Sequence, residues 1–64
     1  MTRHFTYSGD VNALRGFLLT CDGIFFKIED VSSDGVQCII NNQLYLIKDG
    51  SSVTCYENGN VAVV

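Results

Sequence analysis

The sequence predicts a mainly β fold, a small antiparallel meander of five to seven short strands in one domain over residues 1–64. Apolar runs rich in β-branched and aromatic residues, each the length of a strand, occur at Ile24–Ile28, Val36–Ile40 and Leu44–Ile47. Asp34-Gly35 and Asn41-Asn42 separate these runs, and such pairs adopt the backbone angles of tight hairpin turns. Further Asp-Gly or Asn-Gly pairs at 22–23, 49–50 and 58–59 predict turns between the remaining strands. Val53–Glu57 and Val61–Val64 are the last two expected strands, and Arg3–Ser8 is the first.

Six or seven short strands in 64 residues indicate a sheet that curls or closes into a small barrel. Closure removes the exposed strand edges that invite aggregation. In strand count, size and turn spacing the chain is similar to SH3-like small barrels. No family motif accompanies this similarity, so it assigns no functional residue.

The segment 10–20 permits two interpretations. As a helix it has a good N-cap in Asp10 and apolar residues at i, i+3 and i+7, namely Val11, Leu14 and Leu18. Gly16 opposes the helix, because a mid-helix Gly costs about 1 kcal/mol relative to Ala. As a strand, Gly16–Thr20 pairs with the next apolar run across a three-residue turn. We favour the strand, with an irregular piece at 10–15; the alternative is an α+β fold with one short helix at 10–20 packed on the sheet.

Composition argues against several classes of function. The net charge is −3, with seven acids and only four scattered bases, whereas nucleic-acid and anionic-membrane binding draw on clustered Lys and Arg. No run approaches the ~18 apolar residues of a membrane span. The first ten residues have no signal-peptide core, so we expect a cytoplasmic protein without membrane attachment.

The residues that could carry catalysis or bind a metal are few and far apart. His4 is the single histidine, and we expect it to face solvent on the first strand. Cys21, Cys38 and Cys55 are spaced by 17 residues, unlike the paired ligands of zinc sites, and read as reduced thiols in the core. No calcium-loop or phosphate-loop motif is present. We therefore expect neither an enzyme nor a cofactor or metal site.

Strand alternation places apolar residues on both faces of the predicted sheet, and one core can bury only one of these sets. The expected core comprises Ile24, Phe26, Ile28, Val36, Cys38, Ile40, Leu44 and Leu46. The expected outward set is Phe25, Ile39, Tyr45, Ile47 and Tyr56. Monomeric proteins seldom expose a large contiguous apolar patch, so this face predicts a covering helix, a homodimer or another protein.

These observations predict a small non-enzymatic protein–protein interaction module of the inhibitor or adaptor type. It would self-associate through the apolar face, as an accessory protein of a virus or mobile element would. The acidic side chains Glu29, Asp30, Asp34 and Asp49 would contact a basic surface of a partner. One alternative is a barrel that binds single-stranded nucleic acid or a small ligand, with Phe25, Tyr45 and Tyr56 as stacking platforms. Another is a structural subunit of a larger assembly.

Overall fold

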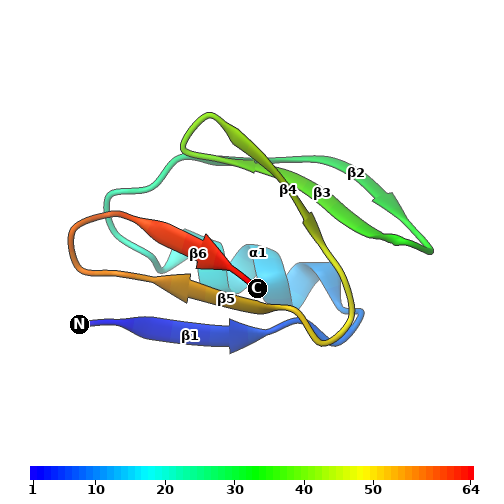
Figure 1. Ribbon diagram of the computed structural model, residues 1–64, viewed down its shortest axis with the longest axis horizontal. Helices are drawn as coiled ribbons and strands as arrows, with labels where there is room; N and C mark the ends of the chain where they lie inside the picture. Colours follow the sequence, from blue (N-terminus) through cyan, green and yellow to red (C-terminus); the bar gives the residue numbers. More distant parts are fainter.

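In the computed structural model, which describes residues 1–64, six strands and one helix form two small antiparallel sheets (Figure 1). In chain order the elements are β1 (Arg3–Thr6), α1 (Val11–Leu19), β2 (Phe26–Ser32), β3 (Gly35–Ile40), β4 (Gln43–Ile47), β5 (Ser52–Cys55) and β6 (Val61–Val63). One sheet has the strand order β1-β5-β6 and the other β2-β3-β4. The predicted mainly β fold is confirmed, in the variant with one short helix.

The predicted strand at 16–20 is wrong, because this part of the chain belongs to α1. Asp10 caps the helix: its carboxylate accepts hydrogen bonds from the backbone N–H groups of Asn12 and Ala13 at 3.0 and 3.2 Å. Leu14, Phe17 and Leu18 form a buried stripe along the helix. Burying one such side chain contributes about 1.5–3 kcal/mol, so the stripe outweighs the ~1 kcal/mol cost of exposed Gly16.

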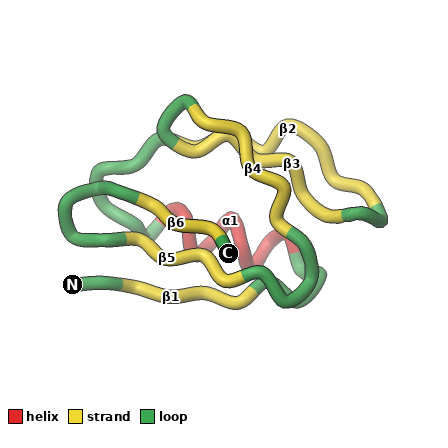
Figure 2. Tube along the Cα trace, in the orientation of Figure 1, coloured by secondary structure: helices red, strands yellow, loops and turns green.

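The predicted closed barrel is also wrong. β4 pairs only with β3, and β6 pairs only with β5, so the two sheets remain separate and each keeps two free edges (Figure 2). The barrel prediction omitted the helix. The helix packs against the inner faces of both sheets, so a core forms although no barrel closes. Leu14 and Leu18 pack in one cluster with Val36 and Ile40 of one sheet and Val53 of the other.

The two faces of β4 are the reverse of the prediction. Asn41 and Asn42 both have positive φ, 51° and 68°, and form a two-residue turn, so Ile40 lies directly opposite Gln43. Cross-strand partners share a face, and the inward parity therefore changes from even numbers on β3 to odd numbers on β4. Tyr45 and Ile47 face the core, whereas Leu44 and Leu46 face outward.

The core has the expected contribution from β3 and an unexpected one from the helix. Val36, Cys38 and Ile40 are fully buried as predicted, while Ile24, Phe26 and Ile28 pack half-buried against them. The cluster is completed by the helix stripe and by Tyr7, Cys21, Ile47, Val53 and Cys55. At the edge of this core the Phe5 and Phe17 rings stack, with centroids 5.2 Å apart.

Asn41 links the two sheets. Its side-chain oxygen accepts the N–H of Phe25 at 3.0 Å, and its side-chain nitrogen donates to the carbonyl of Gly59 at 2.9 Å. Its own backbone N–H donates to the carbonyl of Phe25 at 2.8 Å. The β3–β4 turn is thereby fixed to the turn that precedes β6.

Candidate functional site

An apolar patch lies on the outer face of the β2-β3-β4 sheet. We call it the outer patch: Phe25, Ile39, Leu44 and Leu46. Ile39 pairs directly with Leu44 across the strands, and Gln37 pairs with Leu46. Phe25 is 85 % exposed and lines a shallow hollow with Ile39. Leu44 and Leu46 are 59 % and 44 % exposed, so the sheet presents apolar side chains that nothing in the chain covers.

The outer patch reaches a free strand edge at β4. In the hairpin ladder, Gln43, Tyr45 and Ile47 direct their backbone groups toward β3. The N–H and C=O groups of Leu44 and Leu46 therefore point to the opposite side, and no backbone hydrogen bond joins β4 to anything other than β3. The edge carries no charged residue and no Pro, the usual features that block strand addition.

The predicted interface residues do not form one surface. Phe25 and Ile39 lie in the outer patch as predicted, but Tyr45 and Ile47 face inward. Tyr56 is exposed on the turn after β5, where it lines a different hollow with Met1 and Arg3. The three rings proposed as stacking platforms for nucleic acid, those of Phe25, Tyr45 and Tyr56, thus lie on separate surfaces.

Sequence reasoning missed Leu44 and Leu46 as surface residues. The signal that would have found them is the length of the Asn41-Asn42 turn, because a two-residue turn reverses the parity of the following strand. The helix does not cover the outer patch either. It packs on the inner side of the sheets instead.

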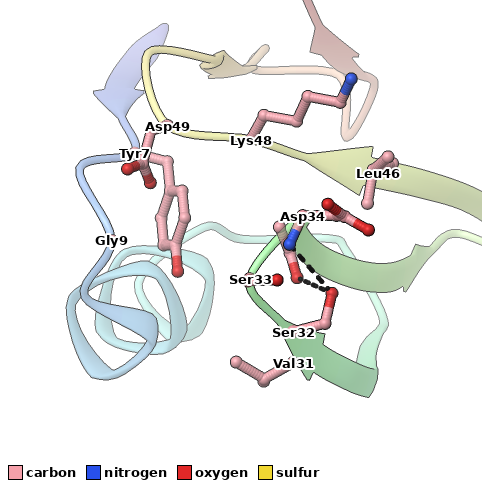
Figure 3. A pocket seen from close by; sticks show the side chains of 10 residues that line it. Tyr7, Gly9, Val31, Ser32, Ser33, Asp34, Leu46, Lys48 and Asp49 are labelled. Carbon is pink, nitrogen blue, oxygen red and sulfur yellow. Dashed lines mark hydrogen bonds between the residues drawn. The ribbon is translucent and has the colours of Figure 1, made fainter.

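Two of the four predicted acidic contact residues come together at a cavity of about 740 Å³. Asp34 lies on the β2–β3 turn and Asp49 on the turn before β5, and both line this cavity with Tyr7 (Figure 3). Asp30 lies opposite Gln37 on the outer side of the hairpin. Glu29 lies at a bulge in β2, where its carboxylate is 3.8 Å from the ammonium group of Lys27.

The three cysteines lie in the core, and the single histidine lies on an exposed position of β1. All three cysteines are buried free thiols. Burial raises the pKa of Cys38, and burial together with the neighbouring Cys21 thiol raises the pKa of Cys55 to about 12, so these two sulfurs remain protonated at neutral pH. His4 is exposed on β1 and its Nδ1 lies 3.0 Å from the Thr54 hydroxyl.

No three His, Cys, Asp or Glu side chains are grouped so that they could hold a metal ion. The nine-residue helix is too short to span a bilayer. Comparison with known proteins gives no match to a family, to a curated protein or to a solved structure. Function is therefore inferred from the outer patch and the β4 edge.

Proposed function

We propose that this protein is a non-enzymatic binding module that pairs with a second copy of itself through the free edge of β4 and the adjoining outer patch. The observation that carries the proposal is the coincidence of two features on one strand. Leu44 and Leu46 direct unpaired backbone groups to the sheet edge, and the same residues expose their side chains on the outer face. A strand added at this edge satisfies the backbone groups and extends the apolar face.

A two-fold axis through Tyr45 gives a specific antiparallel pairing. Leu44 of one copy then lies opposite Leu46 of the other, and each such pair exchanges two backbone hydrogen bonds. The four leucines lie side by side on the outer face and continue the row that begins at Ile39. In this register Lys48 lies opposite Asn42 of the second copy, so no like charges meet.

A single copy of the chain forms a core by itself. This supports association between copies that are already folded, and not folding that requires a second copy. Its accessible surface is 4111 Å², and a monomeric protein of 7.1 kDa is expected to expose roughly 4,100 Å². A pairing through β4 is therefore expected to be reversible. The paired form would present a continuous sheet that a further protein partner could engage.

The test is light scattering coupled to gel filtration, from low micromolar to near-millimolar concentration. We expect the mass to rise toward twice the 7.1 kDa of one chain. Leu44→Asp should hold the protein at the monomer mass, because a carboxylate at the centre of the pairing faces its apolar neighbours. Thr6→Asp, which places the same charge on the exposed side of β1, should leave association unchanged.

A monomer mass at every concentration would refute the self-pairing. Equal loss of association in Leu44→Asp and Thr6→Asp would show that charge in general, and not the β4 edge, governs it. Far-ultraviolet circular dichroism of both variants establishes that the fold is retained.

A further inference from the structure

Two of the three cysteines lie together where α1 and β5 end. Cys21 is the second residue after α1, and Cys55 is the last residue of β5. Both elements end on the side of the molecule that holds the N-terminus (Figure 1), and both cysteines line one hollow of about 430 Å³. Their side chains also belong to one buried cluster. Segments far apart in the sequence thus bring two thiols to a single hollow.

Arg3 joins the two segments that carry these cysteines. It lies directly opposite Cys55 in the β1–β5 ladder, so the two side chains share a face of the sheet. Its guanidinium donates to the carbonyl of Thr20 at 3.1 Å and lies over the Phe17 ring, 5.5 Å from the centroid. The cross-strand partner of Cys55 therefore contacts the residue immediately before Cys21.

The Cys21 side chain is held at the end of the helix and contacts Cys55. The backbone N–H of Cys21 donates to the carbonyl of Leu18 at 3.2 Å, and its thiol donates to the carbonyl of Phe17 at 3.3 Å. Because the Cys21 hydrogen is directed at Phe17, its sulfur accepts the hydrogen bond that joins it to the Cys55 thiol. Two thiols in contact are close to the geometry of a disulfide, whose Cβ atoms lie about 3.5–4.5 Å apart.

Cys38 has a different environment. It is 0 % exposed on β3, the central strand of its sheet, and lines none of the three hollows. Cys21 and Cys55 are 8 % and 4 % exposed at their hollow, so solvent reaches both side chains. The odd number of cysteines thus divides into one isolated core thiol and one adjacent pair.

We propose that Cys21 and Cys55 form a reversible disulfide by exchange with a small-molecule disulfide of the glutathione type. The Cys21 thiolate attacks one sulfur of the small disulfide, breaks its S–S bond and releases one small thiol. The Cys55 thiolate then attacks the Cys21 sulfur and releases the second small thiol. Two protein thiols are oxidised, one small disulfide is reduced, and the two protein protons end on the released thiols.

The first step favours the second. Burial is the largest cause of the raised pKa of Cys55, and the hydrogen bond to Cys21 and the charge of Cys21 add to it. A mixed disulfide at Cys21 carries no charge, so one of these causes disappears when the first step is complete. The Arg3 guanidinium continues to favour the Cys55 thiolate. Cys55 therefore ionises more easily when it has to attack.

The disulfide closes a loop that contains residues 22–54, and with them the whole β2-β3-β4 sheet. A cross-link over a loop of this length mainly restricts the unfolded chain. The Tm of the oxidised protein should therefore exceed that of the reduced protein by roughly 10 °C or more. Leu44 and Leu46 lie outside the cysteine hollow, so the β4 edge stays free in the oxidised form.

The test is incubation of the reduced protein with oxidised glutathione at about pH 8, followed by unfolding in iodoacetamide and mass spectrometry. Cleavage after Arg and Lys places the three cysteines in three peptides, 16–27, 28–48 and 49–64. We expect a link between peptides 16–27 and 49–64 and alkylation of Cys38 alone. The intact chain before alkylation should weigh about 2 Da less than the reduced chain, and dithiothreitol should reverse the change.

Single substitutions separate the two steps. Cys38→Ala is the matched control and should form the disulfide with the yield of the unsubstituted protein. Cys55→Ala should stop at a mixed disulfide on Cys21, with a mass about 305 Da higher. Cys21→Ala should form neither the intramolecular disulfide nor this adduct at the same rate, because the Cys55 thiol is seldom ionised. Far-ultraviolet circular dichroism establishes that each variant is folded.

A link from Cys38 to either other cysteine would overturn the proposal, as would a disulfide between two chains or a lasting glutathione adduct on the unsubstituted protein. The same mixture of links in folded protein and in protein unfolded by urea would show that the fold does not select this pair. The disulfide does not rest on self-pairing. Leu44→Asp, which removes the β4 pairing, should form it with the yield of the unsubstituted protein.

Discussion

Replacing Ile47 with Val tests which face of β4 is buried. Ile47 is 0 % exposed in the core, whereas Leu44 on the same strand is 59 % exposed. Removing one buried methyl group from Ile typically costs 0.5–1.5 kcal/mol, so we expect the free energy of unfolding to fall by about 1 kcal/mol. A domain of this length has roughly 3–10 kcal/mol in total, which makes the loss easy to measure.

The assay is urea unfolding followed by circular dichroism at a few micromolar protein, where self-pairing contributes little to stability. In thermal unfolding the same loss should lower the Tm by about 4–8 °C. Leu44→Val is the matched control on the outer face, and its effect should stay within about 0.5 kcal/mol. If Leu44→Val were the more costly change, the assignment of odd-numbered residues to the core side of β4 would be refuted.

The remaining predictions concern backbone strain and thiol ionisation. Gly35→Ala should destabilise the fold by more than about 2 kcal/mol, because its Cβ would lie 2.7 Å from the carbonyl oxygen of Ile47 at a φ of +137°; Gly16→Ala, with nothing within 4 Å, should instead stabilise the helix by about 0.5–1 kcal/mol. Equal changes in the free energy of urea unfolding for Gly35→Ala and Gly16→Ala would contradict this reasoning. The raised pKa of Cys55, about 12 in the folded chain against 9.0 ordinarily, favours the folded state below pH 9, and this contribution is lost as the pH rises from 9 to 12. Because burial also raises the pKa of Cys38, Cys55→Ala should keep part of this slope, and the unsubstituted protein should be steeper than Cys55→Ala by about 1.4 kcal/mol per pH unit. The same profile in both proteins would refute it.

The strand and turn pattern was largely readable from the sequence. Gly23, Gly35, Gly50 and Gly59, each the second residue of a predicted turn pair, all have positive φ angles. These turns are local devices, since the backbone angles depend on the residue itself and on its immediate neighbours. For the same reason Asp10 could be recognised as an N-cap, although the helix that follows it was not favoured.

The helix and the faces of β4 depended on partners distant in the sequence. Phe17 stabilises α1 through contacts with residues such as Phe5. The sequence argument compared only the helix propensities of neighbouring residues, Gly16 among them, and so omitted these contacts. The outer patch was predicted in kind, as an apolar sheet face that a helix, a second copy or another protein would cover, and the helix does not cover it. Two of its predicted members were wrong. Tyr45 and Ile47 face the core and Leu44 and Leu46 face outward, because the two-residue turn reverses the alternation along β4.

By itself the sequence determined a small antiparallel β domain, the positions of its turns and an apolar excess on the strands between residues 24 and 47. The tertiary structure decided that a helix packs against two open sheets, that Leu44 and Leu46 face outward at the β4 edge, and that Asp34 and Asp49 line one cavity with Tyr7. The physical reason is the range of the interactions. Turns and strand alternation are local, whereas burial and the placement of residues from separate turns around one cavity arise only when the whole chain is packed.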